Sequence, residues 1–392
     1  MKYVLIILIA LLSENTNSQD LISVANTFLN DKNYSEAKTA IDEAFSNSDV
    51  ATNPRAWYTK ARVYHEILKS KDSSVKSLKK NQDEFVNTIV TAYQKTQELT
   101  PKTNNLHILA TNQMELLWGE GINNGYKQFQ EGDFKGAVSS FNISKLVKPR
   151  DTTAYLNAAV SAQNAGMYGE AISNYQSLKN LTRLSKSAYN GMIICKQLLK
   201  VPFEEQLNIV EEALFEYPSY VPYIIQEVRL LVRLNRLDAA ESVLNTSLKR
   251  NPNNAQLIIR RADLYDRIFK ASYLAGEPER SESYFSLASN DYERYINSFP
   301  DDFTANYNYA VMINEQANRI YVRINLMSKE EYEIRGREAE KVGHDWTRRA
   351  LPYMETANSI KPGDSNVKKA LSVFYERLQM DEKLAALNGG QD

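Results

Sequence analysis

The residue types that most often perform catalysis or hold metal ions are few and scattered in this chain. Its three histidines are His65, His107 and His344, and its one cysteine is Cys195. None of the histidines belongs to an HExxH motif or to another paired metal-ligand spacing. No G-x-S-x-G nucleophile elbow, phosphate-binding glycine loop or dinucleotide fingerprint is present. The sequence therefore predicts a protein that is not an enzyme, and we expect no metal and no cofactor.

The lone cysteine is better explained by packing than by chemistry. Cys195 lies in the apolar stretch GMIICKQLL, where a free cysteine behaves as a small buried hydrophobic residue. A reactive thiol is the alternative. With a single cysteine, the chain cannot form an internal disulfide.

The charge balance argues against a nucleic-acid binder. The chain has 47 Lys and Arg and 48 Asp and Glu among 392 residues, and the two signs are mixed throughout. Proteins that bind nucleic acids normally carry a net basic face. Only 14 glycines and 11 prolines are present, a content typical of mostly helical proteins. We therefore expect an all-α protein that binds no nucleic acid.

Side chains suited to protein interfaces are concentrated between Ile320 and Trp346, where arginines and tyrosines are interleaved with five glutamates. Arg and Tyr are common at the energetic centre of protein interfaces. In and beside this segment the candidates are Arg319, Tyr321, Arg323, Tyr332, Arg335, Arg337, Arg348 and Arg349. We expect the segment either to dock a partner protein or a second copy of the chain, or to be a solvated hairpin held by ion pairs.

The element that positions these residues is a repeat. Glu131 to Pro149 reads EGDFKGAVSSFNISKLVKP, and Ala165 to Arg183 reads AGMYGEAISNYQSLKNLTR. The two segments align without a gap, so that Ala137 matches Ala171. Their offset is the 34-residue period that is typical of helix–turn–helix solenoids. Small residues let the two helices of a hairpin approach closely, and bulky residues fill the space between hairpins.

In these positions the chain resembles the tetratricopeptide repeat (TPR). The matching small, aromatic and proline residues of one repeat are Gly125, Ala137, Phe141, Ser144 and Pro149. The resemblance implies an all-α, right-handed superhelical solenoid of TPR-like helix–turn–helix repeats. We expect about seven repeats over 19–362, followed by a capping helix and a polar tail over 363–392.

Several repeats exceed the period, which predicts lengthened hairpins. The interval from Pro252 to Pro300 and the one from Pro300 to Pro362 are both longer than one repeat needs. In the first of these intervals, Gly276 and Pro278 predict the end of one long helix and the start of the next. In the second, the capping box SKEE (328–331) predicts the start of a second long helix.

Two other long repeats are harder to interpret. The segment from Lys69 to Asp83 is polar enough to be a flexible hairpin tip. In the third repeat, Gly119, Gly121 and Gly125 argue against one unbroken helix, so the register of this repeat stays open.

The TPR resemblance also implies a concave groove lined by the first helices of the repeats. The positions that usually face this groove correspond to Tyr126, Phe129, Val160, Gln163, Arg229, Arg233, Asp263, Asp266, Arg267, Tyr307 and Asn314. Some TPR proteins grip a C-terminal carboxylate with a lysine at the fifth position, but no lysine occurs there in this chain. The alternative is that the groove aromatics merely pack against the next repeat.

The start of the chain, residues 1–18 with the sequence MKYVLIILIALLSENTNS, resembles a secretory signal peptide. Lys2 precedes an apolar run from Tyr3 to Leu12, and Thr16 and Ser18 place small side chains before a cleavage at Gln19. The run is shorter than the roughly 20 residues that span a membrane. No cysteine follows the cleavage site to carry a lipid. We therefore predict a periplasmic or secreted protein without a transmembrane segment after cleavage; a buried first helix is the alternative.

Three functions fit these observations. The first is a non-catalytic exported scaffold that binds another envelope or secreted protein through its groove, its extended hairpins or both. The second is a glycan-binding protein, although Trp57, Trp118 and Trp346 are scattered. The third is a hydrolase with an unrecognised site. The leader and the ending ALPYMETANSIKP (350–362) resemble exported repeat proteins of Bacteroidota-type bacteria. We favour the scaffold; its partner, and whether the chain self-associates, stay open.

Overall fold

The chain is built from helices. The computed structural model describes residues 18–79 and 82–389, and these ranges contain helices and connecting turns but no β-strand. The all-α prediction is confirmed. The predicted signal peptide lies outside the described residues, apart from Ser18, which begins the first described helix. No helix within the described ranges is long and apolar enough to cross a membrane.

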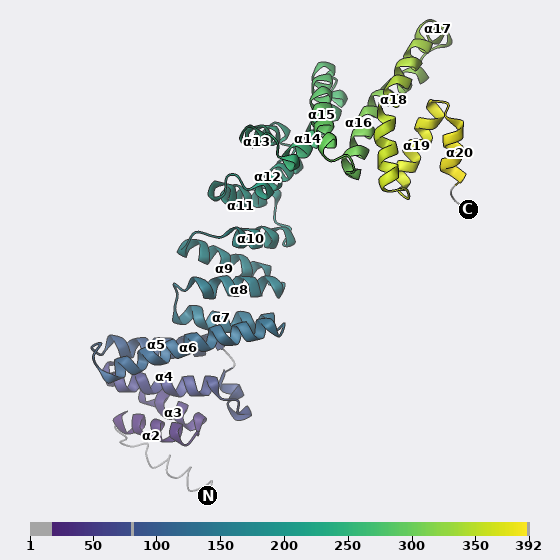
Figure 1. Ribbon diagram of the computed structural model, residues 1–392. Helices are drawn as coiled ribbons and strands as arrows, with labels where there is room; N and C mark the ends of the chain where they lie inside the picture. Colours follow the sequence, from purple (N-terminus) through teal and green to yellow (C-terminus); the bar gives the residue numbers. More distant parts are fainter. Residues whose placement is uncertain (1–17, 80–81, 390–392) are drawn as a thin grey trace. The chain divides into compact units, whose positions relative to one another are not determined.

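The helices fall into two units, which divide between Val201 and Pro202. Figure 1 labels them in chain order. The helices of the first unit are α2 (Ser18–Asn30), α3 (Tyr34–Ala44), α4 (Pro54–Lys69), α5 (Gln82–Glu98), α6 (Asn105–Gln130), α7 (Phe134–Val147), α8 (Thr152–Asn164), α9 (Tyr168–Leu181) and α10 (Lys186–Leu198). The short 3-10 segments η1 (Ser48–Thr52) and η2 (Ser73–Lys79) flank α4.

The second unit continues the same pattern. Its helices are α11 (Phe203–Glu216), α12 (Val221–Arg233), α13 (Leu237–Arg250), α14 (Ala255–Leu274), α15 (Pro278–Ser298), α16 (Phe303–Asn325), α17 (Lys329–Glu331), α18 (Arg337–Ile360), α19 (Ser365–Arg377) and α20 (Asp381–Gly389). A π-helical segment, η3 (Tyr332–Gly336), joins α17 to α18.

The helix boundaries repeat with the period of the sequence. Within the first unit, the start of α9 follows the start of α7 by one period, and α10 follows α8 in the same way. Within the second unit, α13 follows α11 by one period, and α14 follows α12. The small residues Ala137, Ala171 and Ala240 are fully buried on the second helices of their hairpins. In antiparallel helix pairs of this length, the two helices approach each other at small residues. These pairs are the TPR-like repeats that the sequence predicts.

One backbone conformation closes most of the hairpins. A residue with positive φ follows the first helix at Lys32, Gly132, Gly166, Lys200, Asn235, Gly276 and Gln379. At Gly132, where φ is +80°, the next amide, that of Asp133, donates back to the carbonyl of Gln128 at 2.9 Å. This left-handed ending satisfies carbonyls that the helix leaves unpaired, and glycine adopts it without strain.

Two lengthened hairpins have the form that the sequence predicts. In the sixth repeat, α14 has 20 residues and α15 has 21, and Gly276 and Pro278 separate them. In the seventh, α16 has 23 residues, and the Ser328–Glu331 capping box opens the returning helix. The side chain of Ser328 accepts from the Glu331 amide at 3.2 Å, and the Glu331 carboxylate accepts from the Ser328 amide at 3.3 Å.

The third repeat corrects the sequence interpretation. Its first helix, α6, runs unbroken for 26 residues through all three glycines. Gly121 and Gly125 are buried against α7. A Cβ atom at Gly121 would lie 2.3 Å from Oγ of Ser144, and one at Gly125 would lie 2.6 Å from the ring of Phe141. These glycines are thus contact points between two helices, and the packing outweighs the weak helix propensity of glycine.

The polar segment after α4 is also more structured than expected of a flexible tip. Residues 73–79 form the 3-10 helix η2, and Val75 in it is buried. The ammonium of Lys79 donates to the carbonyls of Leu68 at 3.0 Å and Ser70 at 2.6 Å, which holds η2 against the end of α4. Residues 80–81 lie outside the described ranges.

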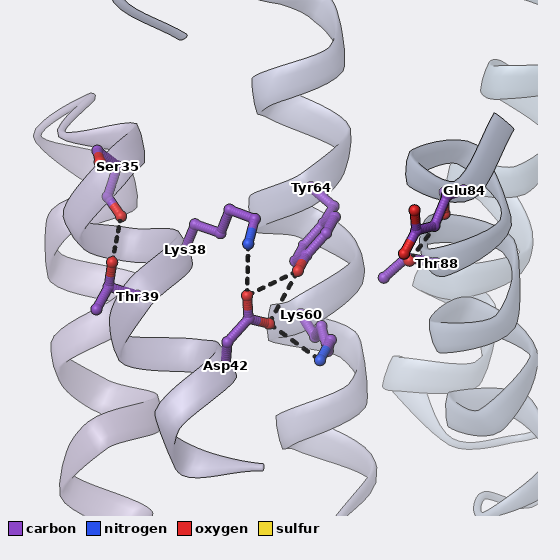
Figure 2. Close-up of polar contacts among 8 residues, drawn as sticks. All are labelled: Ser35, Lys38, Thr39, Asp42, Lys60, Tyr64, Glu84 and Thr88. Atoms are coloured by element: carbon purple, nitrogen blue, oxygen red, sulfur yellow. Dashed lines mark hydrogen bonds and ion pairs between the residues drawn. The ribbon is translucent and has the colours of Figure 1, made fainter. Parts of the chain in front are cut away.

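Polar contacts tie neighbouring hairpins of the first unit together. Figure 2 shows Asp42 of α3 at the centre of one such cluster. Its carboxylate accepts from Lys38 at 2.7 Å and from the Tyr64 hydroxyl at 2.7 Å, and the Lys60 ammonium lies 3.0 Å away. Burial alone would raise the pKa of Asp42, but these three partners hold it below its ordinary value. The cluster therefore favours the ionised carboxylate and fixes α3 against α4.

The second unit ends with two short helices. After α18, the helix α19 buries Val367, Leu371 and Phe374, and the nine-residue α20 follows it. The Tyr375 hydroxyl donates to the carboxylate of Glu355 on α18 at 3.0 Å. A short final hairpin of this kind covers the apolar face that the preceding repeat would otherwise expose.

Candidate binding groove

A groove of about 370 Å³ lies between α12 and α14 in the second unit. Its apolar part is formed by Ile225, Val228 and Val232 of α12 and by Leu264 of α14. Its charged part consists of four arginines, Arg229, Arg233, Arg260 and Arg267, together with Asp263. The groove thus combines an apolar surface with a cluster of guanidinium groups.

Helical periodicity explains why these residues meet. The α12 residues of the groove are 225, 228, 229, 232 and 233, and those of α14 are 260, 263, 264 and 267. Residues three and four apart share one face of an α-helix. The side chain of Asn254 accepts from the Leu257 amide and so fixes where α14 begins. Each helix therefore turns one charged and apolar stripe towards the other.

The groove brings together four of the residues predicted from the TPR resemblance: Arg229, Arg233, Asp263 and Arg267. It also contains Arg260, which that projection missed. Arg260 lies three positions before Asp263 and seven before Arg267, so its spacing on α14 could have revealed it. Asp266, which was expected in the groove, does not line it; its carboxylate binds Lys270 of the same helix at 2.8 Å.

Three of the four arginines, Arg229, Arg233 and Arg260, crowd one another. Burial, followed by the charges of Arg233 and Arg260, lowers the pKa of the Arg229 guanidinium. Arginine nevertheless stays protonated at neutral pH, because its ordinary pKa exceeds about 12. The positive charges therefore persist and repel one another, and an anion in the groove would relieve this repulsion.

The single carboxylate of the groove does not balance these charges. Asp263 accepts from Arg260 at 3.3 Å and from the Tyr292 hydroxyl at 2.9 Å. Burial raises the pKa of Asp263 against these contacts. Within the described residues, Arg229, Arg233 and Arg267 form no ion pair. Arg229 donates to the neutral amide of Gln226, and Arg233 lies 5.1 Å from the centroid of the Phe203 ring.

Three of the four groove candidates of the first unit have packing partners. Tyr126 of α6 is 44% exposed, and its hydroxyl accepts from the amide of Asn157 at 2.8 Å. Phe129 packs edge-on against Phe134 at 5.2 Å between ring centroids. Gln163 accepts from the Tyr175 hydroxyl at 3.1 Å. These contacts fit the alternative in which the aromatic residues pack against the next helices, and only Tyr126 offers a large exposed surface.

The candidates on α16 are engaged in a similar way. Tyr307 stacks on Phe303 of the same helix at 5.9 Å between ring centroids. The side-chain oxygen of Asn314 accepts from Arg377 of α19 at 3.1 Å. Tyr307 and Asn314 do not line the α12–α14 groove.

The candidates of the long hairpin divide into buried and exposed groups. Tyr321 is half-buried, and the Arg377 guanidinium lies 4.3 Å from its ring centroid. Arg319 lies 3.5 Å from the ring centroid of Tyr273. Arg323 and Arg335 are exposed, and Arg335 pairs with Glu331 at 2.6 Å. Only the second group is available to a partner.

The residues with potential for chemistry stay apart. No cluster of His, Cys, Asp and Glu in the described ranges could hold a metal ion. His65 is buried beside the Tyr93 hydroxyl at 3.3 Å. His107 contacts the backbone carbonyls of Gln97 in α5 and of Thr100 just after it. Cys195 is fully buried, and burial raises the pKa of its thiol to about 11. A thiol in this state is a poor nucleophile at neutral pH.

Each of the three tryptophans has its own neighbours within its unit. Trp57 donates to the Ala51 carbonyl at 2.8 Å, and Trp118 donates to Asp151 at 2.7 Å. Trp346, in the other unit, packs against Phe285 at 5.4 Å. Each tryptophan thus has its own packing role.

The likenesses of this chain to known proteins are distant. No protein-family model and no curated protein matches the chain. Among solved structures, MamA is 16% identical, with a TM-score of 0.34, over 46% of this chain and 94% of MamA. YrrB, described as a TPR protein with an unusual peptide-binding site, is 13% identical, with a TM-score of 0.33, over 46% of this chain and 90% of YrrB.

A TPR repeats protein from Bacteroides fragilis NCTC 9343 is 17% identical, with a TM-score of 0.30. That match covers 66% of this chain and 98% of the other. At these identities and TM-scores, none of the three structures bears on the groove or on what it binds.

Proposed function

We propose that the protein is a non-catalytic scaffold that binds an acidic, partly apolar segment of another protein in the α12–α14 groove. The observation that carries this proposal is the pairing of an apolar surface with three arginines that lack an ionic partner among the described residues. Arginine binds carboxylates through charge-assisted and often bidentate hydrogen bonds. Alternating Leu and Glu side chains would fill both parts of the groove.

The direct test uses a short fluorescent peptide of alternating Glu and Leu, with a Lys and Leu peptide as its comparison. We expect the acidic peptide to bind the full chain, with an affinity that falls as salt is added, because screening weakens the charge–charge attraction. The double variant Arg229→Glu with Arg267→Glu should weaken binding about tenfold or more, since each lost charged hydrogen bond costs about 1.5–3 kcal/mol.

The matched control is Lys249→Glu with Arg250→Glu, which changes net charge by the same amount at two exposed residues of α13 outside the groove. This control should bind the acidic peptide nearly as well as the parent. Equal weakening in both variants would mean that binding follows overall charge and not the groove. Equal affinity for the Lys and Leu peptide would also contradict the proposal.

We further propose that the scaffold works outside the cytoplasm, on the strength of the leader-like segment 1–18. The mature chain should then begin at Gln19 and be recovered from the periplasmic or secreted fraction. N-terminal sequencing of the protein from fractionated cells tests this directly. A cytosolic protein that retains Met1 would contradict export. It would favour the alternative, in which residues 1–18 form a buried first helix.

A further inference from the structure

One histidine of the first unit is buried with a ring nitrogen that forms no hydrogen bond. His65 lies on α4 and is 1% exposed. Its Nδ1 lies 3.3 Å from the hydroxyl of Tyr93 on α5. Its Nε2 is also buried, and within the described residues no donor or acceptor reaches it at hydrogen-bond distance. Histidine is the side chain that ordinarily binds a proton near neutral pH, so the surroundings of this ring decide how the fold responds to acid.

A carboxylate of α6 faces this nitrogen. Oε2 of Glu120 lies 3.8 Å from Nε2, which is too far for a hydrogen bond but close enough for attraction once the ring is charged. The other oxygen of Glu120 lies 3.6 Å from the Lys69 ammonium, and Lys69 also lies 4.0 Å from Glu66. These three charged side chains are between 40% and 46% exposed. Glu120 is therefore free to turn from Lys69 towards the ring.

The balance of these surroundings opposes a charge on the ring. Burial removes the water that would solvate an imidazolium, and this effect lowers the pKa of His65 most strongly. The positive charge of Lys69 lowers it further, whereas Glu120 and Glu66 raise it. Burial prevails, so the pKa of His65 lies below its ordinary value of 6.5.

Protonation would also reverse the contact between His65 and Tyr93. The neutral ring with its proton on Nε2 suits both neighbours, because Nδ1 then accepts from the Tyr93 hydroxyl and the N–H points to Glu120. In an imidazolium both nitrogens are donors, so the hydroxyl would have to turn and accept. Tyr93 is fully buried, and burial raises the pKa of its hydroxyl against the opposing charge of Arg62. Tyr93 therefore stays neutral and supplies no charge to balance an imidazolium.

We propose that His65 forms an acid-sensitive contact among α4, α5 and α6, which holds while the ring is neutral and weakens when the ring binds a second proton. These three helices pack against one another in the first unit (Figure 1). Each contributes one group to the contact: the ring comes from α4, the Tyr93 hydroxyl from α5 and the Glu120 carboxylate from α6. Glu120 limits the loss, because it can pair with the charged ring.

The direction of the pKa shift sets the pH range of this response. The neutral ring is favoured more strongly in the folded protein than in the unfolded chain, where the pKa is about 6.5. The stability that His65 contributes is therefore complete above about pH 6.5. It is lost as the pH falls below that value and through the lower pKa of the folded protein.

The first test is urea unfolding of the full chain, followed by circular dichroism, at several pH values from 7.5 to 5.5. The unfolding midpoint of the parent should fall as the pH is lowered. His65→Gln should be less stable than the parent at pH 7.5 but should lose less on acidification, because glutamine does not titrate. His107→Gln is the matched control, since it removes a histidine of the same unit that faces backbone carbonyls. That variant should keep the acid-dependent loss of the parent.

The second test does not depend on how the chain unfolds. The ring resonances of His65 in the folded full chain, identified by their absence from His65→Gln, report its protonation during an NMR titration. Glu120→Gln should lower the pH of half-titration, and Lys69→Gln should raise it, each by about one pH unit, because the first removes an attractive charge and the second a repulsive one.

Two results would overturn the proposal. One is a His65 ring in the parent that titrates at its ordinary pH of 6.5 or above. The other is an acid-dependent loss of stability that is the same in the parent and in His65→Gln. Peptide binding by the α12–α14 groove is measured separately and can succeed or fail on its own.

Discussion

Replacing Ala171 by arginine should destabilise the first unit by roughly 3–5 kcal/mol, because it overpacks a helix contact and buries a charge. Ala171 is fully buried on α9, at the place where the second helix of a TPR-like hairpin approaches the first. Neighbouring hairpins support one another only locally, so the damage should spread from the middle of the array. Urea unfolding followed by circular dichroism measures the change.

Ser173→Arg is the matched control for this substitution. Ser173 lies two positions further along α9 and is exposed, so an arginine there meets water. Its free energy of unfolding should stay within about 0.5 kcal/mol of the parent, as is usual for surface substitutions. If Ala171→Arg and Ser173→Arg unfold at the same urea concentration, Ala171 does not lie at a close helix contact.

Substitutions at two glycines of α6, Gly121 and Gly119, should change the free energy of unfolding in opposite directions. Gly121→Leu should cost about 3 kcal/mol or more, because its Cβ would already lie 2.3 Å from Oγ of Ser144 and 2.8 Å from the backbone oxygen of Ser140. A backbone oxygen cannot rotate away, so α6 and α7 would have to separate. Gly119→Ala should instead raise stability by up to about 1 kcal/mol, since nothing lies within 4 Å of its Cβ and alanine favours the helix.

The same unfolding experiment decides this second prediction, with Gly121→Ala as the closest match to Gly119→Ala. At both positions the substitution adds one methyl group to the same helix, so helix propensity alone would stabilise the two variants equally. A stabilised Gly119→Ala beside a destabilised Gly121→Ala would assign the difference to the contact with α7. Equal stabilisation of the two would mean that α6 and α7 do not approach closely at Gly121.

Much of the repeat architecture was readable from the sequence. The repeat period, the buried positions of Ala137 and Ala171, and the long helices on either side of Gly276 follow from patterns of small residues and helix-ending residues. Four groove residues follow from the TPR resemblance, which implies that a constant set of positions on each first helix faces the groove. Local sequence carries this information, since each repeat contacts mainly its neighbours.

Other features depend on contacts between segments that are far apart in the chain. Gly121 and Gly125 have the pattern of helix breakers, and only the approach of α7 explains why α6 continues through them. By residue type, Tyr321 and Arg319 are typical of protein interfaces. In the structure, Arg377 of α19 covers Tyr321, and Arg319 stacks on Tyr273 of α14, so both are engaged by helices that are remote in sequence. Whether an arginine is paired, stacked or open to a ligand depends on which distant side chain reaches it. The repeats and the faces of their helices therefore follow from local pattern, whereas the packing between repeats sets which of those faces remain open to a partner.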